Sequence, residues 1–240
     1  GNNFIFGLSG NDRITGGADN DFIRGGSGND SIQDNGGSNT IFADDGNDLV
    51  WGGGDVDYIE GGNGDDRLAG GWGVDTIYGG DGNDTIYGGQ LQGKLSGIDS
   101  SNTLFGGNGN DIIYGEFQDD KLYGDNGNDM LYGSYGNDIM DGGAGDDYLG
   151  DGWGSNTFIG GFGDDTLKGG TGNASYIFNL GEGKDIIIDA GGLETLICGP
   201  GITPQNLSFV KDGNNLLVYA AGDSENSTTI QDWYLGASHQ

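Results

Sequence analysis

The sequence predicts an all-β protein in which a long array of short repeats is followed by a β-rich C-terminal cap. Three observations predict this fold. A nine-residue period keeps its frame from Gly7 to Ile177, the residues between the apolar positions are mostly the turn formers Gly and Asp, and the tail contains several apolar, β-rich runs. We therefore expect two parts, residues 1–177 and residues 178–240.

The composition is unusual for a chain that folds without a bound cation. The chain has 240 residues, of which 56 are Gly and only 33% are hydrophobic, and its net charge is −30. Low hydrophobicity with high net charge is typical of disordered chains, so either the chain is unstructured or a cation completes it. The negative charge repels phosphate, so nucleic acid is not an expected partner. No apolar run is long enough to span a membrane.

Each nine-residue unit combines turn residues with a very short strand. Counted from Gly7, units such as GGSGNDSIQ, GGNGDDRLA, GGDGNDTIY and GDNGNDMLY follow one another in 19 consecutive copies. The eighth place is a large apolar residue in all 19 copies, and the sixth place is Asp in 14 of them. Places one to six therefore predict a turn, and places seven to nine predict a strand that buries one side chain.

The pattern GGxGxDxUx resembles the calcium-binding nonapeptide repeat of RTX (haemolysin-type) proteins, and the resemblance covers residues 7–177. It implies a parallel β-roll in which two successive nonamers form one flattened coil. It also implies multiple Ca²⁺ ions between loops that lie two repeats apart in the sequence. Nine such loop pairs have Asp at both sixth places, so we expect about nine ions or more.

Calcium suits this pattern because it takes 6–8 oxygen ligands from carboxylates and backbone carbonyls, and glycine leaves the carbonyls accessible. One loop supplies only part of such a shell, so the stacked neighbour must supply the rest. For the pair of Asp111 and Asp129, the resemblance implies additional ligands from the carbonyls of Gly106, Asn108, Asp125 and Gly127. The expected metal ligands are the sixth-place aspartates Asp12, Asp21, Asp30, Asp48, Asp57, Asp66, Asp75, Asp84, Asp111, Asp120, Asp129, Asp138, Asp147 and Asp165.

A uniform spacing of two repeats sorts the nine pairs into two rows. One row contains 12–30, 30–48, 48–66, 66–84 and 120–138, and the other contains 57–75, 111–129, 129–147 and 147–165. At residues 88–96, Gly93 replaces the sixth-place Asp, whereas Leu95 keeps the apolar frame. We therefore expect the coil to continue through this segment with reduced calcium occupancy, so that the ions form two clusters.

The C-terminal residues 178–240 are expected to cover the last open edge of the roll. Their apolar runs LSFVKD and NLLVYA flank a DGNN turn at 212–215, which predicts a hairpin. The run from Gly201 to Tyr234 is similar to the module that follows haemolysin-type repeats in many secreted bacterial proteins. A solenoid needs such a cap because its last strand would otherwise present unpaired backbone groups.

Two sets of aromatic residues also recur at every second repeat and should form ladders. The interpretation of these ladders is open, because stacking can protect a thin solenoid and can also form a strip for a glycan or cell-surface partner. The sets are Tyr87, Phe105 and Tyr123, and Phe117, Tyr135 and Trp153.

The resemblance implies a secreted, extracellular, calcium-binding module that folds on Ca²⁺ binding outside the cell and assists type I export of its parent chain. We expect a monomer. The chain has no GxSxG, HExxH or paired Cys/His pattern, so no catalytic residue can be named. Two alternatives remain open: the C-terminal part of a secreted hydrolase or epimerase with an upstream catalytic domain, and an adhesive or glycan-binding rod.

Overall fold

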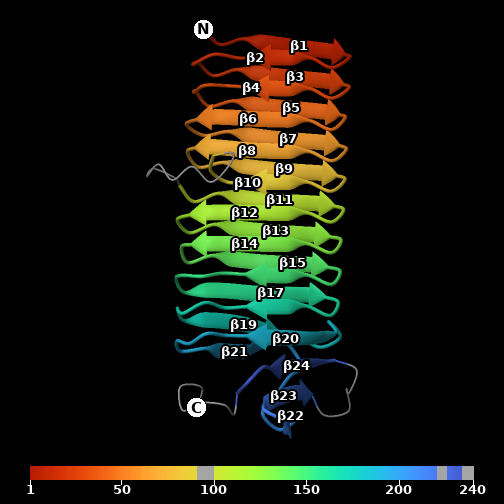
Figure 1. Ribbon diagram of the computed structural model, residues 1–240, viewed down its shortest axis with the longest axis vertical. Coiled ribbons are helices and arrows are strands. Elements are labelled where there is room, and N and C mark those ends of the chain that lie inside the picture. Colours follow the sequence, from red (N-terminus) through yellow and green to blue (C-terminus); the bar gives the residue numbers. More distant parts are fainter. Residues whose placement is uncertain (91–99, 221–225, 234–240) are drawn as a thin grey trace.

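The protein is a tall β-solenoid closed at its C-terminal end by a small β-rich cap (Figure 1). The computed structural model describes residues 1–90, 100–220 and 226–233, and these contain strands and no helix. The described residues consequently include no helix that could cross a membrane. The predicted all-β fold, a parallel β-roll with a C-terminal β-rich cap, is confirmed.

The first sheet has 11 strands, and all of its pairings are parallel. In stacking order they are β1 (Phe4–Ser9), β3 (Phe22–Ser27), β5 (Thr40–Asp45), β7 (Tyr58–Asn63), β9 (Thr76–Asp81), β11 (Thr103–Asn108), β13 (Lys121–Asn126), β15 (Ile139–Ala144), β17 (Asn156–Phe162), β19 (Ala174–Phe178) and β21 (Thr195–Cys198).

The second sheet has 13 strands, and its last three belong to the tail of the chain. In stacking order they are β2 (Arg13–Thr15), β4 (Ser31–Gln33), β6 (Leu49–Gly54), β8 (Arg67–Trp72), β10 (Thr85–Tyr87), β12 (Ile112–Phe117), β14 (Met130–Tyr135), β16 (Tyr148–Gly150), β18 (Thr166–Lys168), β20 (Lys184–Ile188), β24 (Ser227–Ile230), β23 (Asn215–Ala220) and β22 (Leu207–Asp212).

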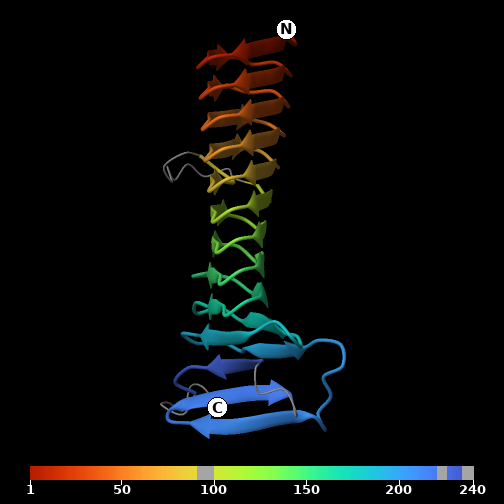
Figure 2. The same ribbon diagram turned by 90° about the vertical axis from the view of Figure 1, so that its right-hand side faces the viewer.

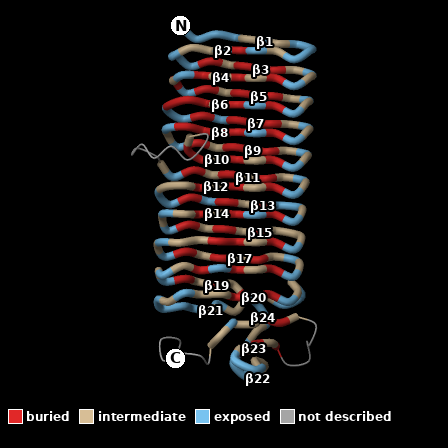
Figure 3. Tube along the Cα trace, in the orientation of Figure 1, coloured by how far each residue is buried: buried red, intermediate tan, exposed pale blue. Residues whose placement is uncertain are grey.

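A single buried side chain per nonamer forms the core between the two sheets. In a strand, alternate side chains face opposite sides, so the eighth place points inward while places seven and nine point outward. Ile23 and Ile41 from the first sheet and Val50 from the second are completely buried. Figure 3 shows this as a buried band that runs the length of the stack. The predicted core is therefore confirmed for the eighth places described.

The second and fourth places of the turns adopt the left-handed backbone conformation that favours glycine. Gly26 and Gly28 have φ values of 116° and 118°. The same conformation persists where another residue replaces glycine, as at Asp44 with φ of 80° and Gln118 with φ of 72°. The turn geometry is therefore imposed by the stack and not only by the local sequence.

Within the described part of the nonamer array, the regular spacing of two repeats fails at one point, between Tyr87 and Thr103. There β9 pairs with β11 so that Ile77 faces Leu104, and β10 pairs with β12 in the same way, three repeats apart instead of two. Because β9 also pairs with β7 and β10 also pairs with β8, no further strand fits between them. The expectation that the coil continues through residues 88–96 is therefore wrong.

The insertion is hidden in the sequence because its length equals one repeat. Gly88 still occupies a first place of the roll. Its backbone N–H donates to the carbonyl of the ninth-place Tyr114 in the next coil at 2.9 Å, as first-place residues do elsewhere in the roll. Asn102 then follows as the sixth-place residue of the same turn. Leu95, which the frame assigned to the core, lies outside the described residues.

One of the two expected aromatic ladders forms as predicted. Phe117 stacks on Tyr135 with ring centroids 5.2 Å apart, and Tyr135 stacks on Trp153 at 6.2 Å. These rings follow one another along the second sheet.

The other ladder was assigned wrongly because it crosses the insertion. Phe105 stacks on Tyr123 with ring centroids 4.8 Å apart, as expected, but its other neighbour is Tyr78 at 4.6 Å. Tyr87 lies in the second sheet and stacks on Tyr114 at 5.1 Å.

The tail continues the stack before it forms the cap. Strand β20 pairs in parallel with β18 and with β24, and β21 pairs in parallel with β19. Strands β24, β23 and β22 are then antiparallel, with the predicted turn at Gly213, and they lie beyond the last coils (Figure 2). The edge of β20 is thus covered, whereas the domain boundary at residue 177 remains a prediction.

Candidate metal sites

The sixth-place side chains form two rows along the roll. The first row lies in the loops that lead from the first sheet to the second and consists of Asp12, Asp30, Asp48, Asp66, Asp84, Asp111, Asp129, Asp147, Asp165 and Asp185. The second row lies in the returning loops and consists of Asp21, Asn39, Asp57, Asp75, Asn102, Asp120, Asp138 and Asn156.

All nine aspartate pairs named from the sequence are neighbours in these rows, but the assignment of pairs to rows was wrong after residue 88. The insertion moves 111–129, 129–147 and 147–165 into the first row and 120–138 into the second. It also creates the pair of Asp84 and Asp111. The expected gap in the first row, and with it the division of the ions into two clusters, has no counterpart in the carboxylate positions.

From Asp21 onward, one carboxylate oxygen of each sixth-place aspartate accepts a hydrogen bond from the preceding coil. The backbone N–H of Asp48 donates to Oδ1 of Asp66 at 2.8 Å, and the N–H of Asp66 donates to Oδ1 of Asp84 at the same distance. These bonds hold each carboxylate in one orientation. The second oxygen, Oδ2, is consequently fixed as well.

The Oδ2 atoms are buried and have no hydrogen-bond partner. This holds for every one of the expected ligands, namely Asp12, Asp21, Asp30, Asp48, Asp57, Asp66, Asp75, Asp84, Asp111, Asp120, Asp129, Asp138, Asp147 and Asp165. A buried polar atom without a partner is unfavourable, and an ionised one is more so. The regular repetition of this cost along the roll makes each Oδ2 atom a candidate ligand of a cation.

The first-place glycines leave a small space into which these oxygens point. A Cβ atom on Gly52 would lie 2.5 Å from Oδ2 of Asp57 and 2.8 Å from the carbonyl oxygen of Gly70 in the next coil. In the first row, a Cβ on Gly61 would likewise collide with Oδ2 of Asp66. Glycine is therefore required here because a carboxylate oxygen and a carbonyl oxygen from two successive coils converge on the same space.

Burial raises the pKa values of many of these carboxyl groups. The pKa is raised to about 8 for Asp57, Asp66 and Asp147, mainly because burial disfavours the charged form. The charge of Asp75 adds to this effect at Asp57, and that of Asp129 adds to it at Asp147. Without a cation, the roll therefore holds its carboxylates in an environment that opposes their ionisation.

The donor set fits calcium. Hard oxygen ligands from carboxylates and backbone carbonyls, in turns without side-chain obstruction, are what Ca²⁺ takes. No cluster of three or more His, Cys, Asp or Glu side chains forms within the described part of the chain, so carboxylates alone would not fill a calcium shell, and backbone carbonyls or waters would supply the remaining ligands. Asp66 and Gly79 would contribute to one such site. The complete ligand sets, including that implied for Asp111 and Asp129, remain predictions.

The three sixth-place asparagines differ from the aspartates in their side-chain chemistry, and Asn39 shows the consequence. Its side-chain amide donates to the carbonyls of Gly37 at 2.8 Å and Gly52 at 3.3 Å. The Gly52 carbonyl occupies the role that the Gly70 carbonyl has at Asp57, so the amide uses an oxygen that elsewhere faces the free space. At Asn39 the amide thus takes the place of a cation, whereas Nδ2 of Asn102 is buried without a hydrogen-bond partner.

Three acidic residues were missed as candidate ligands. Asp34 and Asp151 stand at first places, and their Oδ2 atoms are buried without partners. Asp185 extends the first row beyond residue 177, because the N–H of Asp165 donates to its Oδ1 at 3.3 Å. Two features of the sequence could have identified these residues. Asp stands at the first place in only two nonamers, and the sequence GEGKD, which ends with Asp185, overlaps the start of β20.

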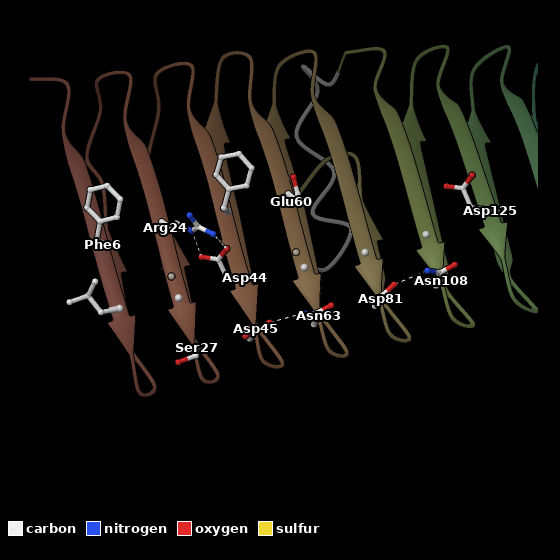
Figure 4. A pocket seen from close by; sticks show the side chains of 18 of the residues that line it. Phe6, Arg24, Ser27, Asp44, Asp45, Glu60, Asn63, Asp81, Asn108 and Asp125 are labelled. Atoms are coloured by element: carbon white, nitrogen blue, oxygen red, sulfur yellow. Dashed lines mark hydrogen bonds and ion pairs between the residues drawn. The ribbon is translucent and has the colours of Figure 1, made fainter.

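A groove of about 970 Å³ follows the first sheet from β1 to β13 (Figure 4). Its floor consists of glycines, and ninth-place side chains such as Phe42 border it. Several of its polar side chains are paired with one another: Arg24 Nε donates to Asp44 at 2.6 Å, and Asn63 Nδ2 donates to Asp45 at 2.6 Å. These side chains therefore bond to neighbouring coils of the roll itself. A glycan partner for the groove remains a prediction.

The solenoid and its rows of aspartates define a calcium-binding repeat protein, and comparison with known families agrees. The model of the RTX calcium-binding nonapeptide repeat, which represents four copies, matches residues 1–32, 33–68, 69–90, 96–131, 119–149 and 151–173. The chain therefore belongs to the RTX calcium-binding nonapeptide-repeat family, whose repeats bind Ca²⁺ and form a structural β-roll.

Other comparisons are weaker. No curated protein sequence matches the chain significantly. Among solved structures, the crystal structure of an extracellular lipase from Serratia marcescens aligns with 95% of this chain, at 18% identity and a TM-score of 0.26. The chain spans 38% of the length of that lipase.

Proposed function

We propose that this chain is the calcium-dependent folding module of a secreted bacterial protein. The observation that carries the proposal is the continuous first row from Asp12 to Asp165, in which every aspartate has a buried Oδ2 without a partner. A row of buried carboxylates opposes folding until cations neutralise it.

The repeat buries too little apolar surface to fold without such ions. Each nonamer buries one large side chain while it orders nine residues of backbone, so the hydrophobic contribution falls short of the lost conformational entropy. Ions that bind only the folded chain then supply folding free energy. Ligands would be the Oδ2 atoms of the two rows together with first-place carbonyls such as that of Gly79.

This coupling gives the module a direction. Extracellular calcium modules typically bind at about 10⁻⁴–10⁻³ M, so such sites stay empty in the cytosol and fill outside the cell. The chain would therefore leave the cell unfolded and fold after export, which would assist the export of its parent protein. Membership of the RTX family and the proposed coupling of folding to calcium support this extracellular location and the role in type I export.

Circular dichroism tests the proposal. In excess chelator the far-UV spectrum should be that of a disordered chain, and millimolar Ca²⁺ should produce a β-sheet spectrum. Mg²⁺ at the same concentration should not, because it demands a smaller octahedral shell and loses water reluctantly. Identical β-sheet spectra with chelator and with Ca²⁺ would refute the proposal.

An upstream catalytic domain is compatible with this function, because an RTX roll can serve the folding of any chain that precedes it. The proposal assigns no catalytic role to the residues of the roll. Full occupancy, which we expect at about nine ions or more, can be measured as bound calcium per chain.

A further inference from the structure

Two first-place residues break the glycine rule of the array in the same circumstance. Asp34 begins the nonamer that has Asn39 at its sixth place, and Asp151 begins the nonamer that has Asn156 there. Everywhere else in the array the first place is Gly, except for Ala43. A carboxylate thus appears at the first place where one has been lost from the sixth place.

The structure turns Asp34 toward the aspartate of the preceding coil. Asp34 is completely buried, and its Oδ1 accepts the N–H groups of Asn35 at 2.6 Å and Gly36 at 3.1 Å. Its Oδ2 points into the space left by Gly16, where Oδ2 of Asp21 also lies, 2.8 Å from the position of a Cβ on that glycine. Both Oδ2 atoms are buried and have no hydrogen-bond partner.

The second case repeats this geometry further along the roll. Oδ1 of Asp151 accepts the N–H groups of Gly152 and Trp153, the latter at 3.1 Å. Its Oδ2 and that of Asp138 converge on the space left by Gly133, and Oδ2 of Asp138 lies 2.5 Å from the position of a Cβ there. These two oxygens are also buried without partners, and Asp138 is only 1% exposed.

Two ionised carboxylates that face one another in a buried space repel unless something positive lies between them. The asparagine on the far side of the coil does not provide it, because the Asn39 amide donates away from this space, to the carbonyls of Gly37 and Gly52. Asp34 therefore creates a new demand for positive charge between its own coil and that of Asp21.

A third first-place carboxylate shows how such a group is satisfied without an ion. Asp189 lies in the space left by Gly169, and its Oδ2 accepts the hydroxyl of Tyr176 at 2.5 Å. The sixth-place residue of that coil is Ala174, so no second carboxylate is present. A phenol can thus complete a lone carboxylate here, whereas Asp34 and Asp151 have no such donor at Oδ2.

We propose that the pairs Asp21–Asp34 and Asp138–Asp151 form a second type of calcium site, each holding one Ca²⁺ ion between two coils through side chains at the sixth and first places. In the ordinary sites the second coil contributes a first-place carbonyl to the free space, and in these sites it contributes a first-place carboxylate. The inference rests on the proposed calcium-dependent folding and adds two sites that the sixth-place pattern does not predict.

Counting bound ions in the full chain tests the proposal. The variants Asp34→Asn and Asp151→Asn keep the Oδ1 acceptor and supply an amide that can donate to Asp21 or Asp138, so they can remain folded. At saturating calcium, equilibrium dialysis with metal analysis should show one Ca²⁺ ion fewer per chain in each variant and two fewer in the double variant. Asp212→Asn, an exposed residue of the cap hairpin, should lose none.

A compensating change separates a lost site from a damaged fold. Asn39→Asp combined with Asp34→Gly rebuilds the ordinary pattern, with glycine at the first place and Asp at the sixth, and should restore the lost ion and the fold. Unchanged stoichiometry in Asp34→Asn and Asp151→Asn, with the wild type binding calcium normally, would show that each pair shares a proton and would overturn the inference. A wild type that binds no calcium would instead overturn the proposed function itself.

Discussion

The backbone N–H of Asp84 donates to Oδ1 of Asp111 at 2.7 Å, although the two aspartates are three repeats apart in the sequence. This bond joins the row of carboxylates before the insertion to the row after it. The candidate cation sites of the first row therefore form one continuous series, and folding that begins on one side of the insertion can propagate to the other.

The first prediction concerns this continuity. Deleting residues 91–99 should leave the calcium midpoint of folding unchanged within about twofold, because β9 already pairs with β11 and β10 with β12. Calcium titration followed by circular dichroism measures the midpoint.

Deleting residues 112–120, which are also nine in number, is the matched control. This deletion removes β12 and brings Asp111 into line with the second row, so it should raise the midpoint several-fold. Equal midpoints for the two deletions would contradict the register described here.

The second prediction concerns the charge of one row. Asp129→Asn should raise the calcium midpoint by about three- to tenfold, because ligand charge sets the affinity of calcium sites. The amide keeps an acceptor for the Asp111 N–H, which now bonds Oδ1 at 2.7 Å. Asp146→Asn is the control, since this exposed residue also accepts a backbone N–H from the next coil. Similar shifts in both variants would argue against a special role for the rows.

The third prediction concerns the space at the first place. Gly61→Ala should raise the calcium midpoint by about tenfold or prevent folding, because its methyl group would collide with Oδ2 of Asp66 and lie 2.6 Å from the Gly79 carbonyl oxygen. Gly54→Ala is the control, since its Cβ would meet Trp72 at 3.8 Å, an ordinary contact. A folded Gly61→Ala variant with wild-type calcium binding would show that the space does not hold the ion.

The fourth prediction concerns pH in the absence of metal. The raised pKa values, about 6 for Asp48 and about 8 for Asp66 and Asp147, mean that the folded roll binds protons more tightly than the unfolded chain. Their protonation therefore stabilises the metal-free roll fully below the unfolded pKa near 3.8, and this stability is lost as the pH rises through about 6 to 8.

In buffer freed of metal by a chelating resin, the chain should gain β-sheet signal as the pH falls from about 8 to about 4. The calcium midpoint, by contrast, should change little between about pH 6 and pH 8.5, because the unfolded chain and the calcium-bound roll are both ionised in that range. A midpoint that falls steeply with rising pH would mean that calcium displaces protons from a roll that is already folded.

The fifth prediction concerns the cap. Deleting residues 178–240 should raise the calcium concentration needed for folding or abolish folding, because β18 then loses its neighbour β20, whose own outer edge is covered by β24. Deleting residues 1–18 is the control. This deletion removes only the first coil, whose strand β1 lies at the edge of the first sheet and whose Phe4 is 78% exposed, so it should raise the midpoint less than loss of the tail does. Equal midpoints for the two truncations would argue against a capping role for the tail.

Much of this structure could be predicted because the repeat is local. The apolar eighth place predicted the core strand by strand, and Ile23, Ile41 and Val50 are all completely buried. The sixth-place aspartates were identified from the same frame, and in the structure they occupy equivalent positions whose Oδ2 atoms lack partners. Short-range patterns of this kind need no knowledge of which coil lies beside which.

The partners of each residue were less predictable, because they depend on the stack. A spacing of two repeats gives the sixth-place Asp21 only Asn3 and Asn39 as neighbours in its row. In the structure, the first-place Asp34 of the next coil also faces Asp21. In the same way, the frame placed Tyr87 on Phe105, and the structure stacks it on Tyr114. In both cases the neighbour of the side chain belongs to a different coil or sheet from the one that the repeat frame predicts.

The sequence by itself determined the unit of this protein: a turn of Gly and Asp, one buried apolar residue, and a repeat pattern whose resemblance to the RTX nonapeptide implies calcium binding. Only the tertiary structure decided which units are adjacent. An insertion with the length of one repeat leaves the frame of Leu104 and Ile113 intact, while it moves their preceding neighbours from two repeats away to three. Strand pairing resolves this because each strand has only two edges, and those of β9 and β10 are already filled.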